Sequence, residues 1–206
     1  MKPPSKNTLK LIYAYEVGGG ESYYNKHLKN FTWPGAASGP TIGIGIDTAY
    51  YSKEELAEIF SYLPLKQRQL VENASGKKGK AGDEYTKTLK AAKIEMPWSL
   101  AEKIFMFTTW KKFANLAESV FPQLEDLCGD AYGAIVSLVF NRGSSLKGDS
   151  REEMRRIKEL IPSKDYAGIA DQIRKMKRLW EGKGLDGLVR RREAEAAAVE
   201  SCLQQS

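Results

Sequence analysis

Two carboxyl groups and one hydroxyl group in the first quarter of the chain could do chemistry together. Glu16 follows the apolar stretch LIYAY, and Thr41 and Asp47 stand at the two ends of the run TIGIGID. A protonated carboxyl can act as a general acid while a second carboxylate acts on a sugar or on a water, and this pairing is used to hydrolyse glycosidic bonds. Glu16, Thr41 and Asp47 are therefore the candidate catalytic residues.

Glu16 is the candidate acid because of its expected surroundings. It falls at the C-terminal end of a helix expected over about residues 8–16. The negative end of the helix dipole disfavours an ionised carboxylate there, and the neighbouring Tyr15 and Val17 would keep water away from it. Acidic residues also lie near helix ends for structural reasons, so Glu16 is assigned as the acid only in combination with the second carboxylate, Asp47. Glu21, in a Gly/Ser-rich turn, is a rival for which a solvated acid is the simpler interpretation.

The run TIGIGID predicts a β-strand that contains two glycines. Alternate residues of a strand share a face, so the three isoleucines would point into a core while Thr41, Gly43, Gly45 and Asp47 share the other face. Because Gly43 and Gly45 have no side chains, a ligand could lie flat against the backbone, and both are candidate substrate-binding residues. A straight strand would hold Thr41 and Asp47 about 20 Å apart. Their joint action therefore requires a bend or hairpin at Gly43–Gly45.

Periodicity, capping residues and turn residues predict a mostly helical chain with one small β region. The aromatic, β-branched and turn-rich residues 23–51 favour a hairpin or small sheet. Residues 75–84 are expected to form a flexible basic loop, and the apolar residues 130–140 to form the core helix around which the others pack. The remaining helices are predicted over about 8–16 (capped by Asn7 and ending at Gly18-Gly19-Gly20), 52–62 (opened by a capping box, Ser52 to Glu55), 65–73, 99–120 (opened by Ser99), 150–162, 163–174 and 185–203.

Composition excludes several classes of protein. With 206 residues, 42% of them hydrophobic and 28% charged, this is the sequence of a folded globular chain, without an apolar run long enough to cross a bilayer. The stretch LIYAY is too short for a signal peptide, so transport out of the cytoplasm would need another route. The single His27 excludes zinc sites built on several histidines, and no residue spacing implies a metal or cofactor. Cys128 and Cys202 are expected to be buried or free thiols rather than a disulfide.

The basic character of the chain bears on its partners. A net charge of +6 favours an anionic partner, such as nucleic acid or the bacterial envelope, or simply a well-solvated surface. Basic clusters lie at 77–80, 174–178 and 190–192. They would attract anionic polymers in a cell-wall enzyme and contact phosphates in a DNA-binding protein. No recognition motif for nucleic acid accompanies them, and the second cluster is best interpreted as a solvated helix face.

Several motifs follow one another in an order that resembles the phage-type lysozymes. After Glu16 and a glycine run come SGPTIGIGID at 38–47, FNRG at 140–143 and RRREAE at 190–195. The similarity covers nearly the whole chain, and it is closest to the pesticin-like branch and related bacterial muramidase domains.

This resemblance implies a lysozyme-like α+β fold. A small β-containing lobe and a larger, mainly helical lobe would hold a substrate cleft between them. One catalytic domain would cover 1–206, with the β-containing lobe at about 17–62 and the helical lobe at about 63–206 together with a helix at 7–16.

The resemblance also assigns roles to the candidate catalytic residues. In phage-type lysozymes the glutamate that ends the first helix is the general acid, which matches Glu16, and the threonine that opens the TIGIG run is functional, which matches Thr41. Many of these enzymes carry an aspartate shortly before that threonine, but residues 33–40 contain no acid. Pesticin-like members have an aspartate six residues after it, and Asp47 matches that position. The residues that flank Asp47 differ from the tyrosine and the Leu-Gly found there in those relatives.

Further residues are candidate substrate contacts by the same resemblance. The FNRG motif would line the cleft, where Asn141 and Arg142 could bind an acetamido group or a peptide stem. A simple helix cap at Gly143 is an equally good interpretation of the motif. Trp33 could stack on a sugar face, although packing is the more common role of aromatic residues in a small sheet.

The implied activity is hydrolysis of the β-1,4 bond between N-acetylmuramic acid and N-acetylglucosamine, with lysis of the bacterial cell wall and no cofactor. Glycan strands would be the partner of an expected monomer, an immunity or inhibitor protein is a further candidate, and neither nucleic acid nor an integral membrane segment is expected. The protein would be made in the cytoplasm and reach the wall through a holin-made lesion or specialised secretion. Three alternatives stay open: a lytic transglycosylase, a non-catalytic glycan-binding module of the same fold, and a basic helical nucleic-acid-binding protein.

Overall fold

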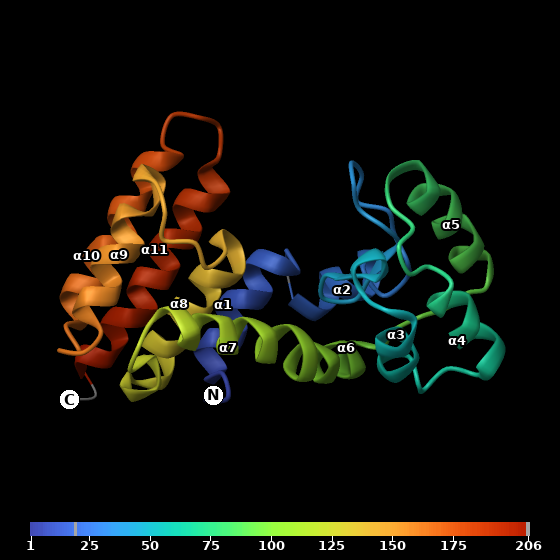
Figure 1. The fold of residues 1–206 in the computed structure, drawn as a ribbon, viewed down its shortest axis with the longest axis horizontal. Coiled ribbons are helices and arrows are strands. Elements are labelled where there is room, and N and C mark those ends of the chain that lie inside the picture. Colours follow the sequence, from blue (N-terminus) through green and yellow to red (C-terminus); the bar gives the residue numbers. More distant parts are fainter. Residues whose placement is uncertain (19, 205–206) are drawn as a thin grey trace. The chain divides into compact units, whose positions relative to one another are not determined.

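The computed structural model describes residues 1–18 and 20–204, so Gly19 of the predicted glycine stop lies outside the described residues. The described chain is mostly helical, with a two-stranded antiparallel sheet of β1 (Thr41–Ile42) and β2 (Ile46–Asp47) (Figure 1). This confirms the helical chain with one small β region. The α-helices are α1 (Lys6–Glu16), α2 (Gly20–His27), α3 (Lys53–Ile59), α4 (Leu65–Glu72), α5 (Gly79–Ala91), α6 (Trp98–Phe105), α7 (Lys111–Val120), α8 (Gly129–Arg142), α9 (Glu152–Leu160), α10 (Tyr166–Lys175) and α11 (Asp186–Glu200).

The chain packs as two compact units. The hairpin unit is Glu16–Phe107, and the helical unit combines Met1–Tyr15 with Thr108–Ser206. Helices α3, α4 and α5 therefore pack with the β-hairpin, and the division falls before Glu16 and after Phe107 rather than near residue 62. The grouping of both units into one catalytic domain stays a prediction.

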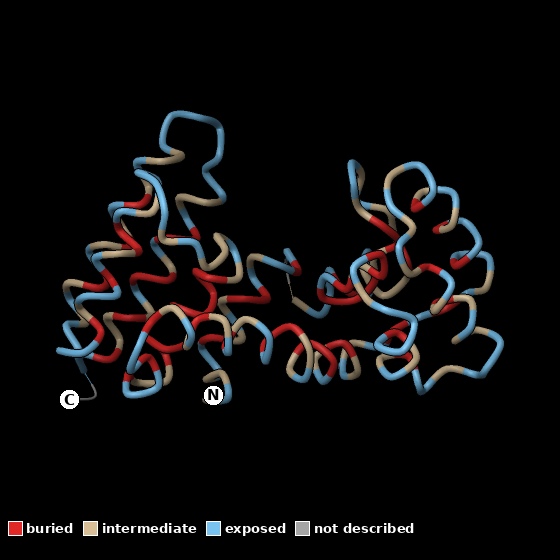
Figure 2. The backbone as a smooth tube through the Cα atoms, viewed as in Figure 1, coloured by how far each residue is buried: buried red, intermediate tan, exposed pale blue. Residues whose placement is uncertain are grey.

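The hairpin unit has its own hydrophobic core, and its helices alternate between buried and exposed residues (Figure 2). The isoleucines of TIGIGID are all buried, as their alternation predicts. Phe31 and Phe60 stack within this core, with ring centroids 6.1 Å apart. The buried Tyr24 hydroxyl donates a hydrogen bond to Met96 O at 2.7 Å, and burial raises the pKa of Tyr24. Aromatic packing and a hydrogen-bonded hydroxyl group thus stabilise the hydrophobic core of the hairpin unit.

The helical unit is built around α8. Every residue from Asp130 to Val139 is buried, which confirms that this apolar segment is a core helix. Gly133 allows α1 to approach α8 closely, because a Cβ at this position would overlap the Thr8 side chain. Helices α9, α10 and α11 lie side by side in the same unit (Figure 1).

Two predictions about the first half of the chain were wrong. Residues 23–27, predicted to belong to the hairpin or small sheet, lie in α2; Glu21 in its first turn and Lys26 and His27 in its last turn complement the helix dipole. The predicted flexible loop at 75–84 contains the start of α5 at Gly79. Both segments contain glycines and charged residues, which weaken the helical pattern in the sequence. Their helices are stabilised by packing of the apolar face.

Several helix ends also differ from the predicted ones. Ser5, rather than Asn7, accepts a hydrogen bond from Thr8 N at 3.0 Å at the start of α1. A π-helical segment, Met106–Trp110, divides the long helix predicted over 99–120, and the helix begins at Trp98 after Pro97. Side-chain capping depends on the backbone conformation of the residues before the helix, which residue types alone do not determine.

Other helix starts give a mixed result. The capping box of Ser52 and Glu55 is confirmed, with both reciprocal hydrogen bonds present. Helix α9 begins at Glu152 after a short 3-10 turn, and α10 is capped by Asp165 rather than opened at Ser163.

Cys128 and Cys202 form a disulfide, so the expectation of buried or free thiols was wrong. Their Cα atoms lie 6.1 Å apart although the residues are separated by 74 positions, because the start of α8 and the 3-10 helix Ser201–Gln204 pack together. Among the helices of the described residues, none is both long and apolar enough to cross a membrane.

Candidate functional site

A tight antiparallel hairpin brings Thr41 and Asp47 opposite each other. The two residues are directly paired in the register of β1 and β2, next to the pair of Ile42 and Ile46. Gly43 and Gly45 turn the chain between them with φ angles of 68° and 76°, which glycine adopts at little cost. Directly opposed residues hold their Cβ atoms about 5 Å apart. The predicted hairpin at Gly43–Gly45 is therefore confirmed, and it removes the separation that a straight strand would impose.

The two glycines of the hairpin meet different surroundings. A Cβ on Gly43 would lie 2.8 Å from Met96 Sδ, whereas a Cβ on Gly45 would meet no atom within 4 Å. Gly43 is buried and Gly45 is exposed. The missing side chain at Gly43 is thus explained by the turn and by Met96 without a ligand. Gly45 is the one of the pair that borders open space, and it stays a candidate substrate contact.

The Asp47 carboxylate is held by backbone hydrogen bonds. Gly39 N donates to Oδ1 at 3.0 Å and to Oδ2 at 3.1 Å, and Ala49 N donates to Oδ1 at 3.0 Å. Asp47 thereby caps the 3-10 helix Thr48–Tyr50. The residue is half-buried, so its carboxylate has a fixed orientation and a solvent-facing part.

Gly39 belongs to this site and was not among the predicted site residues. A Cβ there would lie 2.5 Å from Ala49 Cβ, 2.7 Å from Lys77 O and 2.8 Å from Asp47 Oδ1, so a larger residue does not fit. Thr41 Oγ1 donates a hydrogen bond to Gly39 O at 3.1 Å. Thr41 and Asp47 therefore both bind Gly39: the Thr41 hydroxyl group donates to its carbonyl oxygen, and the Asp47 carboxylate accepts from its N–H group. The Gly-Pro pair at 39–40 signals a turn in the sequence but does not reveal this close approach.

Glu16 is the last residue of α1 and the first residue of the hairpin unit, which confirms its predicted place at a helix end. It is exposed, so the expected shielding by Tyr15 and Val17 was wrong. Val17 is buried and Tyr15 is half-buried, but successive residues at a helix end point in different directions and do not cover one another. Glu21 is also exposed and lies in the first turn of α2.

Trp33 is half-buried and closes the loop that precedes β1. Its Nε1 donates a hydrogen bond to Ser38 O at 2.9 Å, across the exposed residues of the loop. This bond gives Trp33 a structural role in orienting the segment that carries Gly39. A sugar-stacking role stays a prediction.

Asn141 and Arg142 lie in the helical unit, at the end of α8. Gly143 caps this helix with a φ of 75°, and its N–H donates to Val139 O at 2.7 Å, which bears out the cap interpretation. Asn141 is exposed. The Arg142 guanidinium donates to Ser150 O and lies 4.8 Å from the centre of the Trp180 ring. Burial, aided by nearby positive charges, lowers the pKa of Arg142 to about 10.

Two of the basic clusters are largely neutralised within the fold. In the cluster at 174–178 the four basic side chains form ion pairs with Asp171, Glu193, Glu200 and Glu153. In the cluster at 190–192, Arg191 and Arg192 are buried and both bond to the buried Glu195. This third cluster is therefore not the surface patch that its sequence predicts.

Residues 1–18 and 20–204 contain no group of three or more His, Cys, Asp or Glu side chains placed to hold a metal ion. Residues 21–195 match the family described as phage lysozyme. The chain belongs to the phage lysozyme family. Members of this family hydrolyse peptidoglycan, and that general activity applies to this chain. A comparison with curated proteins found no match.

The matched residues of the phage lysozyme family include the β-hairpin and the end of α8 but begin after Glu16. Thr41 and Asp47 therefore lie within the part of the chain that matches the phage lysozyme family. Glu16 lies before the matched residues, and its role as the acid stays a prediction.

Proposed function

We propose that this phage lysozyme is a muramidase that cleaves the β-1,4 bond between N-acetylmuramic acid and N-acetylglucosamine. The observation that carries the proposal is the direct pairing of Thr41 with Asp47 at a hairpin whose turn residue Gly45 borders open space. A carboxylate of fixed orientation beside a hydroxyl group suits the placement of a water molecule next to a sugar.

Each catalytic residue has a distinct role in the proposed reaction. Glu16, exposed at the end of α1, protonates the oxygen of the leaving sugar. Asp47 accepts three backbone hydrogen bonds, and since a carboxylate offers about four acceptor positions, it can accept one more from a water. Thr41 donates to Gly39 O and can accept a hydrogen bond from the same water. Attack by that water inverts the anomeric carbon.

The finer biological setting is part of the proposal. The aspartate six residues after Thr41 supports a place in the pesticin-like branch. The disulfide between Cys128 and Cys202 supports action outside the reducing cytoplasm, at the cell wall or in the periplasm. Release through a holin-made lesion or specialised secretion would bring the enzyme there, as a monomer, with an immunity or inhibitor protein as a candidate partner.

Digestion of purified peptidoglycan, with mass spectrometry of the released fragments, tests the reaction. The parent protein should release fragments with reducing muramic acid ends. Thr41→Ala and Asp47→Asn should slow their release by about 10²-fold or more, because general catalysis contributes on that order. Anhydro-muramic ends would instead identify a lytic transglycosylase, and binding without any product would leave a glycan-binding module.

A further inference from the structure

Within the part of the chain that the structure describes, the basic cluster at 77–80 has no carboxylate counter-charge. Lys77, Lys78 and Lys80 form no ion pair with any carboxylate of residues 1–18 and 20–204, unlike the cluster at 174–178. Lys78 and Lys80 are exposed. Unneutralised cations close together at the start of α5 favour an external anion.

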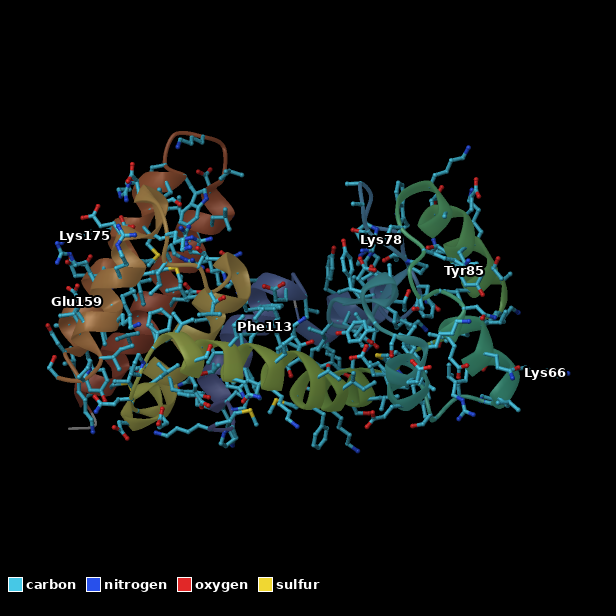
Figure 3. The ribbon with its side chains drawn as sticks, viewed as in Figure 1. Lys66, Lys78, Tyr85, Phe113, Glu159 and Lys175 are labelled. Carbon is cyan, nitrogen blue, oxygen red and sulfur yellow. A yellow bond between two sulfur atoms is a disulfide. The ribbon has the colours of Figure 1, made fainter. Side chains whose placement is uncertain are left out.

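Lys78 is also held in place by an aromatic ring. Its Nζ lies 3.8 Å from the centre of the Tyr50 ring. Tyr50 leaves 62% of its surface exposed, so the ring and the lysine that lies over it are both open to a ligand from solution. The neighbouring Lys77 lies 5.0 Å from the centre of the Tyr85 ring, whose hydroxyl donates to Leu70 O. Both lysines are thereby held against the hairpin unit, and Figure 3 shows Lys78 and Tyr85 in the same part of it.

The loop between α4 and α5 that carries Lys77 and Lys78, here called the lysine loop, is bonded through the first residue of α5 to the segment that holds Asp47. Gly79 N donates to Ser38 O at 3.0 Å, next to Gly39, whose amide binds the Asp47 carboxylate. Tyr50 ends the 3-10 helix that Asp47 caps. The Tyr50–Lys78 pair is therefore tied to the proposed catalytic carboxylate from two sides, through the lysine loop and through the 3-10 helix.

We propose that Tyr50 and Lys78 form a subsite for a carboxylate on the peptide stems of the glycan strand. This inference rests on the proposed function. The muramic sugars of peptidoglycan carry stems with free carboxylates, and an ammonium group with three donors binds such an anion. The Tyr50 ring lies against the Lys78 ammonium group and limits its conformations, so less entropy is lost when the anion binds. Lys78 is thus a specificity-determining residue that favours glycan whose stems carry free carboxylates over glycan whose stems carry none.

Binding of soluble glycan to the full-length protein in the Glu16→Gln background tests the subsite without cleavage. Two ligands are compared: glycan strands with free carboxylates on their stems, and the same strands after those carboxylates have been converted to amides. Lys78→Ala should weaken binding of the untreated strands about two- to fivefold, the range of an exposed ion pair, and leave binding of the amidated strands unchanged. Lys78→Arg should retain the parental affinity, and Tyr50→Ala should weaken binding as Lys78→Ala does.

Lys66 supplies the matched control, because it is an exposed lysine of the same unit on α4 (Figure 3). Lys66→Ala should leave both affinities unchanged. Equal losses for untreated and amidated strands, or an equal loss in Lys66→Ala, would overturn the proposal. Release of fragments by Glu16→Gln during the assay would contradict the proposed mechanism. It would not bear on the subsite, because the subsite is tested by comparing the affinities for the two ligands.

Discussion

Asp47 combines a structural task with a proposed catalytic one. Its carboxylate caps the 3-10 helix through Ala49 N and holds the loop through Gly39 N. A loss of activity on substitution could therefore come from local disorder as well as from missing chemistry. Asparagine keeps one oxygen acceptor, so Asp47→Asn preserves the hydrogen bonds that Gly39 N and Ala49 N donate to Oδ1 and removes the charge.

Asp47→Asn should therefore separate stability from activity. We expect the free energy of unfolding to fall by less than about 1.5 kcal/mol, the net worth of one hydrogen bond. The rate of peptidoglycan hydrolysis should fall far more. Urea denaturation and hydrolysis measured on the same preparation check this. A parallel loss of folding and activity would assign Asp47 to structure alone.

Asp130 makes stability depend on pH. Burial alone would raise its pKa, but hydrogen bonds from Ser5, Asn7 and Ser201 outweigh burial and lower the pKa of Asp130. A lowered pKa in the folded state stabilises the protein above the unfolded pKa, which is near 3.9. That contribution is lost as the pH falls from this value through the folded pKa.

Asp130→Asn should destabilise the protein by about 1–3 kcal/mol at neutral pH, because charged hydrogen bonds are lost. Below pH 4 the difference in unfolding free energy between parent and variant should shrink. Urea denaturation at several pH values checks the sign. A difference that stays constant from pH 7 to pH 3 would contradict the role of the charge.

The residues of the site could be predicted only in part. Thr41 and Asp47 could be paired in advance because a shared reaction requires a turn, and the glycines permit one. The role of Gly39 could not, because it follows from close contact with Ala49 and Lys77 across the loop. Exposure of Glu16 likewise depends on the direction of its side chain, which neighbouring residue types do not determine.

At the scale of elements, the hairpin turn offers a matched pair of substitutions. Gly43→Ala should destabilise by about 1–3 kcal/mol, because positive φ is strained for alanine and its Cβ would press on the buried Met96. Gly45→Ala meets only the strain, so its cost should be about 1 kcal/mol. Thermal or urea denaturation of both variants checks this order. An equal cost would show that Met96 yields without penalty.

Elements with a local signal could be predicted, and elements without one could not. The capping box of Ser52 and Glu55 and the apolar run of α8 are local patterns, and both appear where expected. Helices α2 and α5 contain glycine and many charged residues, and their buried residues, such as Tyr24 and Leu89, are too sparse to mark a helical face. Tertiary packing decides such segments.

At the scale of the whole molecule, two clamps hold the helical unit together. The disulfide joins Cys128 before α8 to Cys202 after α11. Asp130 binds Ser5 and Asn7 near the N-terminus and Ser201 near the C-terminus. The start of α8 is thus the point where both ends of the chain are fastened.

Reduction of the disulfide should lower the free energy of unfolding by up to about 4 kcal/mol, since it closes a loop of 74 residues. For a protein of this size the melting temperature should fall by roughly 10 °C. Calorimetry with and without a thiol reductant measures the change. Cys128→Ser/Cys202→Ser serves as the control, because reductant should not shift its melting temperature. An unchanged melting temperature in the reduced parent would contradict the clamp.

Comparison of two glutamates tests whether Glu16 is the general acid of a muramidase. Release of reducing muramic ends should be measured for the parent, Glu16→Gln and Glu21→Gln, each shown to be folded by circular dichroism. We predict a loss of about 10²-fold or more for Glu16→Gln and parental activity for Glu21→Gln. Full activity in Glu16→Gln, with loss in Glu21→Gln, would contradict this prediction and move the acid to the start of α2.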